Sequence, residues 1–305
     1  MATPLPRSGP LSISDIVSTF GGTGEISLSD YYGSDTELPT SGPISIGNFR
    51  GLPLRIRAFG GDIVFDEEDE SGDLYRFHKF TSSGTFSVTE INTSTPDVNY
   101  LVVAGGGGSR GYNAAGAGAG GYRSGSTSVS VTDYGIGIGG GGSGLGGRGN
   151  GNNGSNSSAF GITSTGGGGG GGDDYSGRSG GSGGGAADAN LTGASGISGQ
   201  GFKGGNAFGN GSRGAGGGGA SERGANTNES HRGGDGKQWL DGNYYAGGGS
   251  GSGRGVIPGG LGGGGTGENG GDGRLGTGGG AGGERSYKAR GGNGGSGVVI
   301  IRYLL

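Results

Sequence analysis

Alternating apolar and polar residues predict short β-strands in the region before residue 92. The stretches 54–59, 74–80 and 85–91 each alternate in this way, as a strand with one buried face does. Between them, Gly72-Asp73 and Ser83-Gly84 have the residue types of tight turns. We therefore expect short strands that are joined by turns.

Two further stretches, 98–104 and 298–303, are almost continuously apolar. Such runs are typical of strands that are buried on both faces. They lie nearly 200 residues apart, and each needs a partner strand. Pairing the two runs in one small sheet satisfies both of them, so we expect them to lie side by side.

A weaker alternation involves Val129, Val131, Ile136 and Ile138, and it predicts a hairpin over 126–139 that joins the same sheet. The globular part of the chain is then a small β-sandwich. It is built from residues 56–104, 126–139 and 298–305.

Glycine fills the interval between the two apolar runs. Of the 93 glycines, 12 precede residue 105 and none follows residue 297, so 81 lie within 105–297. With 28% hydrophobic residues, the chain cannot build one ordinary apolar core throughout its length. The uninterrupted run 166–172 also excludes the collagen repeat, which has glycine only at every third position.

The insertion 105–297 is either a flexible linker or a structure held together by its own backbone. An extended helix with three residues per turn points its N–H and C=O groups in three directions, and glycine lets such helices approach closely. Because a floppy loop between two paired strands has no evident purpose, we favour the ordered form. The predicted fold is mainly β: a small β-sandwich with a large glycine-rich insertion that forms a polyglycine-II helix bundle.

Residues 1–55 contain a threefold repeat, which reads SGPLSISDI, GGTGEISLSDYYG and SGPISIGNFRG. Each copy has few apolar residues and cannot bury a core alone. The repeat forms either three similar turns of one small fold or a segment that becomes ordered on other subunits. This pattern resembles the N-terminal module of many tailed-bacteriophage structural proteins, which implies docking to other virion subunits.

Charge and composition exclude several classes of function. A formal net charge of −4 gives no electrostatic footprint for nucleic acid, and no apolar run approaches the ~20 residues of a membrane span. Without cysteine, and with only His78 and His231, neither a cysteine-ligated metal nor a histidine-based catalytic triad has support. The acidic run 66–70 lacks the order of a calcium loop and is interpreted as a solvated turn. We expect no cofactor, no metal and no enzymatic activity.

Bulky side chains are rare after residue 140, so their clusters are candidate receptor contacts. Such side chains must lie at the bundle surface or in loops, where they either bind a receptor or cap exposed backbone. The strongest cluster is 237–245, which holds the single tryptophan. The candidates are Trp239, Tyr244, Tyr245, Lys237, Asp241, Tyr175, Tyr112, Tyr287 and His231.

The motifs HKFTSSGTFSVTE, NYLVVAGGGGS, GAGGYRSG and GGSGVVIIRY, which span 78–303, resemble the glycine-rich domain of bacteriophage tail-fibre and adhesin proteins. The resemblance implies a virion adhesin. The T-even distal-fibre adhesins of this kind stack polyglycine-II helices and bind host surface receptors through exposed loops. This chain departs from them at its N-terminus, where it carries the threefold repeat in place of their attachment domain.

The sequence thus predicts a non-enzymatic bacteriophage virion protein, a tail-fibre or tail-tip adhesin. Its partners are a host cell-surface receptor, protein or glycan, and other virion subunits that bind residues 1–55. It inserts into no membrane. The alternatives are a fibre or capsid decoration protein without a receptor of its own, a glycan depolymerase, and an ice-binding or cell-wall glycine-rich protein.

Overall fold

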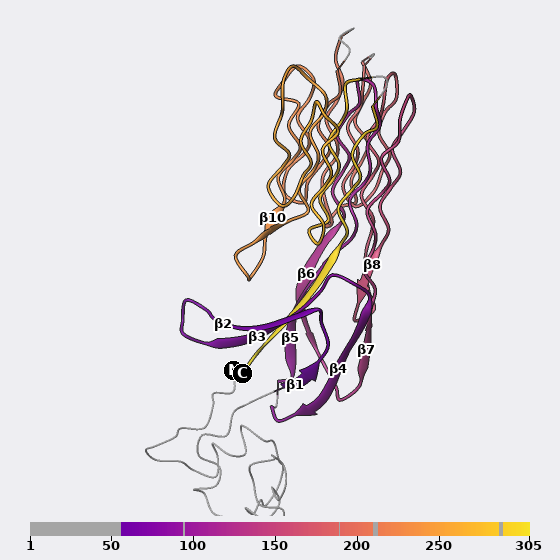
Figure 1. The fold of residues 1–305 in the computed structure, drawn as a ribbon. Coiled ribbons are helices and arrows are strands. Elements are labelled where there is room, and N and C mark those ends of the chain that lie inside the picture. The colour runs from indigo at the N-terminus through magenta and orange to yellow at the C-terminus, as the bar shows by residue number, and fades with distance from the viewer. Residues whose placement is uncertain (1–55, 94, 189, 210–212, 287–288) are drawn as a thin grey trace, which may run out of the picture.

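The computed structural model describes residues 56–93, 95–188, 190–209, 213–286 and 289–305. The N-terminal repeat in 1–55 and its expected docking role lie outside the described residues. Within these ranges the fold is mainly β, as predicted, and it contains several antiparallel sheets and no α-helix (Figure 1). Consequently, the described part of the chain has no helix of the length and apolar character that could span a membrane.

The larger sheet has five strands in the order β2-β3-β12-β5-β6. They are β2 (Ile63–Glu68), β3 (Leu74–Phe80), β12 (Val298–Leu304), β5 (Asp97–Val103) and β6 (Tyr122–Ser128). The C-terminal strand lies in the centre, where Ile301 is opposite His78 on one side and Tyr100 on the other. The predicted pairing of the two apolar runs is confirmed, and it brings the two ends of the glycine-rich insertion together.

The smaller sheet has three strands in the order β1-β4-β7, and it packs against one face of the larger sheet. They are β1 (Ile56–Phe59), β4 (Gly84–Ile91) and β7 (Asp133–Ile136). Side chains from both sheets share one apolar core, to which Phe86 and Val88 contribute from β4 and Val102 and Ile301 from the facing sheet. Apolar side chains at alternate positions of these strands therefore face inward, as the sequence pattern predicts.

The pairing corrects the expectation of one hairpin over 126–139. Strand β6 pairs with β5 in the larger sheet, whereas β7 pairs with β4 in the smaller sheet. The residues between them cross from one sheet to the other, and Val129 is buried in the core at this crossing. The apolar alternation is thus real, but it marks a change of sheet instead of a turn.

Two short hairpins complete the strands, and the sequence pattern did not predict either of them. They are β8 (Ser157–Ala159) with β9 (Ile162–Ser164), and β10 (Lys237–Gln238) with β11 (Tyr244–Tyr245). The β8–β9 hairpin lies beside the core, and Phe160 in its turn packs against that core. Its strands have only three residues each, too few for a periodic pattern to show.

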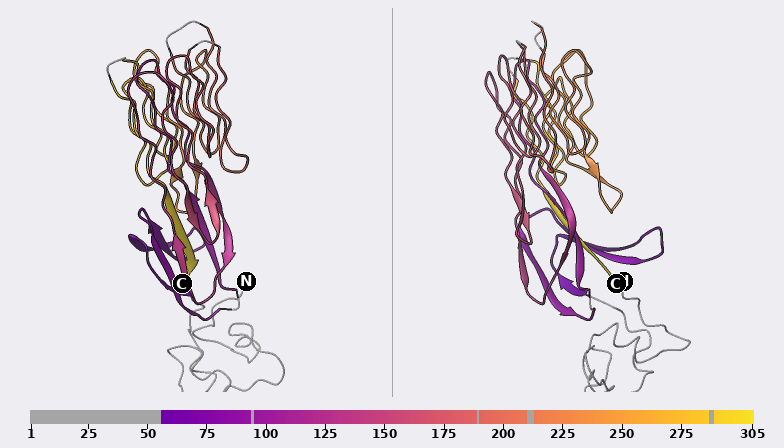
Figure 2. Two further views of the ribbon diagram at one scale, coloured as in Figure 1. Left: turned by 90° about the vertical axis from the view of Figure 1, so that its right-hand side faces the viewer. Right: turned by 180° about the vertical axis from the view of Figure 1, so that it is seen from behind.

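The glycine-rich segments run from the sandwich to a far end and back several times, as extended chains side by side (Figures 1 and 2). They are joined by backbone hydrogen bonds between segments that are distant in the sequence, such as Gly106 N–H to Gly295 O at 2.9 Å and Gly217 N–H to Gly249 O at 2.8 Å. Backbone groups thus satisfy one another where side chains are absent.

Segment 114–121 lies inside this bundle and shows its pattern best. Its N–H groups donate to three neighbouring segments in turn, so that every third residue reaches the same neighbour. The acceptors of residues 114 to 121, in order, are the carbonyls of Glu284, Gly171, Ala215, Ala281, Gly168, Gly218, Gly278 and Thr165. Three other segments donate to its carbonyls, through Ser252 and Gly249, through Gly185 and Ser182, and through Gly107 and Ala104.

Alanine and glycine are not interchangeable in this segment. The alanines 114, 115, 117 and 119 are completely buried, so their methyl groups fill the available gaps. A methyl group on Gly116, by contrast, would overlap the carbonyl of Gly249, and one on Gly118 would overlap that of Ser182. The glycines therefore mark the points where two backbones touch, which gives the bundle a specific packing in the absence of large side chains.

Candidate functional site

The far end of the bundle is formed by loops that hydrogen-bond to one another, and we call it the tip. It comprises loops 110–113, 146–149, 172–175, 187–188, 267–270 and 284–286. Each follows a segment that leads away from the sandwich. Segment 165–172, for example, begins directly after β9 and would extend roughly 25 Å at about 3.1 Å per residue. The tip thus lies at the end of the glycine bundle that is opposite the sheets (Figure 2).

Tyr112 joins two of these loops through its backbone. Its N–H donates to Ser286 O at 3.1 Å, and its carbonyl accepts the N–H of Asp173 at 3.4 Å. Tyr175 lies in the next loop, where its carbonyl accepts the N–H of Ala187, and its side chain is 48% exposed. The structure therefore brings the predicted candidates Tyr112 and Tyr175 to one end of the molecule. Tyr287 lies outside the described residues.

Charged side chains at the tip are mostly held by partners within it. Arg148 Nε lies 2.6 Å from Asp173 Oδ2, and Arg285 lies 3.5 Å from Glu268. Arg110 donates to the carbonyls of Asn150 and Gly146 at 2.9 and 2.7 Å. These contacts satisfy backbone groups at the end of the bundle and fix the positions of the charges.

Several tip residues other than glycine have a positive φ, which is uncommon for residues with a side chain. The values are 68° at Tyr112, 49° at Asn113, 65° at Asp174, 52° at Asp188 and 79° at Glu268. Glycine adopts such angles without strain and is abundant in this chain. Strained backbone of this kind is concentrated at functional sites in proteins. At these turns a residue with a side chain therefore stands where glycine would adopt the same backbone angle without strain.

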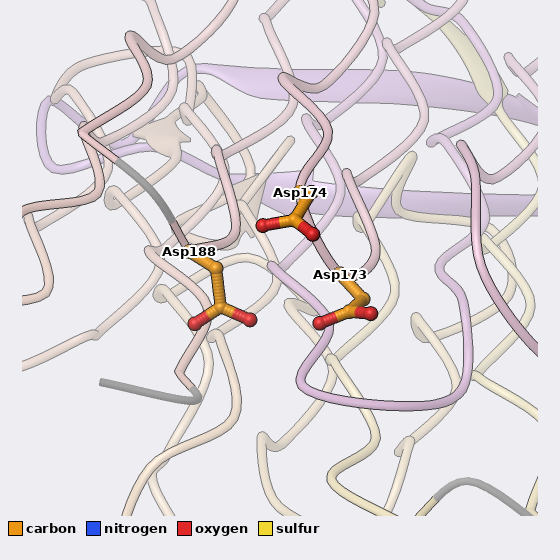
Figure 3. Close-up of side chains that lie close together, drawn as sticks. All are labelled: Asp173, Asp174 and Asp188. Atoms are coloured by element: carbon orange, nitrogen blue, oxygen red, sulfur yellow. The ribbon is translucent and has the colours of Figure 1, made fainter. Parts of the chain in front are cut away.

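Three tip carboxylates lie close together, those of Asp173, Asp174 and Asp188 (Figure 3). One oxygen from each lies within 4.8 Å of the others, and oxygen ligands of this type suit Ca²⁺. Cationic and N–H partners already occupy part of the cluster, because Arg148 pairs with Asp173 and the N–H of Arg213 donates to Asp188 Oδ1 at 3.0 Å. We therefore make no metal assignment.

Burial, and then the neighbouring carboxylates of Asp173 and Asp174, raises the pKa of Asp188 to about 6, although the N–H of Arg213 acts in the opposite direction. Since this lies above the unfolded value of about 3.9, the carboxyl group favours folding below about pH 4 and loses that contribution as the pH rises through 6. We expect Asp188→Asn to stabilise the protein at pH 7 by about 1 kcal/mol, after allowance for solvent screening.

The measurement is urea unfolding of Asp188→Asn and of the parent chain at several pH values between 4 and 8. The gain should shrink as the pH falls toward 4, where Asp188 is protonated in both states. Asp133→Asn, at an exposed position in β7, is the control and should give no such pH-dependent difference. An equal gain at every pH would contradict the prediction.

The hairpin of β10 and β11 lies at the other end of the bundle, on the outer face of the five-stranded sheet (Figure 1). The Trp239 ring meets Phe77 of β3 edge-on with 6.1 Å between centroids. Tyr245 packs in the same cluster, and its hydroxyl donates to Asp241 Oδ2 at 2.7 Å. Burial, and then this bonded carboxylate, raises the pKa of the Tyr245 hydroxyl well above its usual range. The hairpin thus covers an apolar sheet face.

This geometry corrects the expectation of a surface position for two of the three aromatic rings of 237–245, those of Trp239 and Tyr245. Trp239 is 7% exposed and Tyr245 is 2% exposed, so both belong to the apolar cover of the sheet. Lys237 and Tyr244 are exposed, and Asp241 is partly exposed. The cluster that the sequence favoured therefore divides into a buried half and an exposed half, and neither half lies at the tip.

Residues 81–304 match the glycine-rich domain family. The chain belongs to this family. The match begins just before β4 and ends in β12, so it includes the whole glycine bundle together with the paired strands β5 and β12. No curated protein matches the chain.

Both histidines of this glycine-rich domain protein are buried, and a ring nitrogen of each lies within hydrogen-bond distance of a backbone carbonyl. His231 lies in the bundle, where its Nδ1 is 2.9 Å from Gly214 O. This burial removes it from the exposed candidates. His78 lies between the sheets, with Nδ1 2.7 Å from Gly60 O and Nε2 3.1 Å from the Tyr303 hydroxyl. Burial lowers the pKa of His78, which agrees with the structural role predicted for it.

The acidic run 66–70 of the chain divides between the end of β2 and the turn that follows. Asp66 pairs with Arg76 across the two strands at 2.8 Å, which lowers the pKa of that carboxyl group. Asp69 accepts the N–H groups of Ser71 and Asp73 and so closes the turn. The interpretation as a turn holds for its second half, and Asp66–Glu68 belong to the strand.

Proposed function

We propose that this glycine-rich domain protein is a non-enzymatic bacteriophage virion protein, a tail-fibre or tail-tip adhesin that attaches the particle to a host surface receptor. The observation that carries this proposal is the tip, where loops far from the sheets present tyrosine and charged side chains on strained backbone. Aromatic side chains with polar neighbours are common at the centre of protein interfaces. The tip, in place of the hairpin 237–245, is the proposed receptor contact.

We also propose that the extended segments are polyglycine-II helices. Such a helix has three residues per turn, so its N–H groups point in three directions. The return of every third N–H of segment 114–121 to the same neighbour supports this assignment, as does the close backbone approach at Gly116 and Gly118. A bundle of this kind would hold the tip away from the virion.

Residues 1–55 would dock the protein to other virion subunits. The protein would then lie on the exposed surface of the virion, in the tail or in a tail fibre. This part of the proposal depends on the likeness of the threefold repeat to tailed-phage structural modules. In this proposal the sandwich connects the docking segment to the glycine bundle, since β1 follows residue 55 directly in the sequence.

A second candidate is a fibre or capsid decoration protein without a receptor of its own. The internal pairing of the tip charges favours it, because Arg110, Arg148 and Arg285 all bond to tip groups, as residues that only cap the bundle would. The two candidates differ in whether an exposed tip side chain contributes to host binding.

We expect Tyr175→Ala to weaken adsorption of the full chain to host cells by about tenfold, because an exposed aromatic contact is lost while the backbone bonds of its loop remain. Tyr244→Ala is the matched control, since Tyr244 is 41% exposed but lies in the β10–β11 hairpin. Binding to cells, competition with phage adsorption and thermal unfolding would be measured for both variants.

Unchanged adsorption of Tyr175→Ala combined with a loss for Tyr244→Ala would move the receptor site to the hairpin. Absence of both cell binding and competition by the full chain would refute the adhesin and favour the decoration protein. Release of fragments from host polysaccharide on incubation would indicate a glycan depolymerase instead.

A further inference from the structure

A groove runs along the flank of the molecule between β6, the β10–β11 hairpin and the turn 197–200. It consists of two hollows of about 520 and 450 Å³, and Tyr122 and Lys237 line both of them. Each hollow has the size of a small-molecule site. We call this surface the flank groove, and it is separate from the tip.

The flank groove is positively charged in an acidic protein. The chain has only four lysines, and two of them, Lys203 and Lys237, line this groove. Neither lysine forms an ion pair within the described part of the chain, and the Lys237 ammonium lies 5.6 Å from the centre of the Tyr122 ring. The described residues that line the two hollows include no aspartate or glutamate. An anionic ligand is therefore favoured here.

The turn 197–200 borders the same hollow and contains N–H groups without an internal partner. Gln200 N–H donates to Ile197 O at 2.9 Å and closes the turn, in which Gly199 has a φ of 77°. The central N–H groups, those of Ser198 and Gly199, have no hydrogen-bond partner among the described residues, and both residues line the hollow. Unpaired N–H groups in a turn suit a carboxylate or phosphate oxygen.

The remaining lining suits a sugar. Phe202 is 49% exposed, although large side chains are rare in this part of the chain, and an exposed ring can pack against the C–H face of a sugar. Exposed serine hydroxyls stand along the groove at Ser124, Ser126 and Ser198, and each can both donate to and accept from a sugar hydroxyl. Cationic, aromatic and hydroxyl groups thus line one continuous surface.

We infer that the flank groove binds an acidic glycan, a sugar chain that carries carboxylate or phosphate groups. The anionic substituent lies between Lys203 and Lys237, and the sugar ring packs on Phe202. This inference goes beyond the proposed receptor contact at the tip, because it assigns a second binding surface with its own ligand class, and it rests on the adhesin function only for its biological setting. The site itself is distinct from the proposed tip contact.

The test is a calorimetric titration of the full chain with four probes: oligogalacturonate, mannose 6-phosphate, a neutral maltooligosaccharide and polyglutamate. At least one of the two acidic sugars should bind at least about tenfold more tightly than the neutral sugar and polyglutamate, since a charge-assisted contact and a sugar contact act together. The carboxylate and phosphate arms show which anionic substituent the groove prefers.

The double variant Lys203→Gln/Lys237→Gln should lose at least about tenfold in affinity for the preferred acidic sugar. Arg123→Gln is the matched control, because Arg123 lies on β6 next to Tyr122 but its side chain points to the other face of the strand. Its affinity should equal that of the parent chain. Circular dichroism and thermal unfolding confirm that each variant is folded.

Three results would overturn the inference: no binding of either acidic sugar, equally tight binding of polyglutamate, or the same loss in Arg123→Gln as in the double variant. Host-cell binding without any binding of acidic sugars would remove the inference and leave the adhesin proposal intact. Binding of an acidic sugar without host-cell adsorption would support the inference and refute the adhesin proposal.

Discussion

Replacing Gly116 by alanine is expected to lower the free energy of unfolding by about 3 kcal/mol or more, because the new methyl group has no space. It would overlap the carbonyl of Gly249 and lie 2.8 Å from the carbonyl carbon of Ser250. Both obstacles are backbone atoms, so no side chain can rotate away. Relief requires the segment 249–252 to move, and this would break the bonds from Gly249 to Ala117 and from Ser252 to Ala114.

Urea unfolding and amide hydrogen exchange across 114–121 would measure the effect. Gly140→Ala is the matched control, because nothing lies within 4 Å of a methyl group there and its φ is not positive. The control should change stability by less than about 1 kcal/mol. Equal losses in both variants would show that glycine acts through chain flexibility and not through close packing of backbones.

The strands of the sandwich were predictable because burial imposes a pattern on their side chains. The runs that became β5 and β12 contain apolar residues on both faces, and only a central position in a covered sheet buries both. The crossing after β6 was not predictable, since Val129 is apolar whether the chain turns back or passes to the other sheet. Distinguishing the two requires knowledge of the partner strands.

The arrangement of the glycine segments could not be read from the sequence. A glycine has no side chain whose polarity could indicate an inner or outer face, so no periodic pattern reports the neighbours of a segment. In segment 114–121 the only signal is the choice of alanine or glycine at each position, and that choice depends on which backbone lies opposite. The glycine-rich composition indicated a structure held together by backbone hydrogen bonds. Which segments bond to one another becomes visible only in the folded structure.

The candidate site was predictable in part for the same reason. Rare bulky residues correctly indicated loops at the tip, where Tyr112 and Tyr175 lie. They misled for Trp239, because a lone tryptophan among glycines has the same appearance whether it binds a partner or covers a sheet. One signal was present in the sequence: β5 is apolar on both faces, so its outer face needs a cover from elsewhere in the chain.

Trp239→Ala is expected to destabilise the protein by about 3–5 kcal/mol, the usual range when a buried tryptophan or phenylalanine is truncated. The variant removes the ring that packs against Phe77 and opens the cluster that Tyr245 and Ile300 share. The turn that carries Trp239 is itself held by hydrogen bonds to Asn243 and Gly242, so the hairpin cannot easily collapse into the space. A residual cavity therefore adds to the lost burial.

Leu240→Ala provides the control, because Leu240 is the next residue and is half exposed. Urea unfolding should show a loss of no more than about 0.5 kcal/mol for this variant, in contrast to the large loss for Trp239→Ala. Adsorption to host cells, measured on the same samples, should fall for Trp239→Ala only in proportion to the fraction of unfolded protein. A stable Trp239→Ala that fails to adsorb would instead make Trp239 part of a receptor contact, at the hollow of the flank groove that it lines.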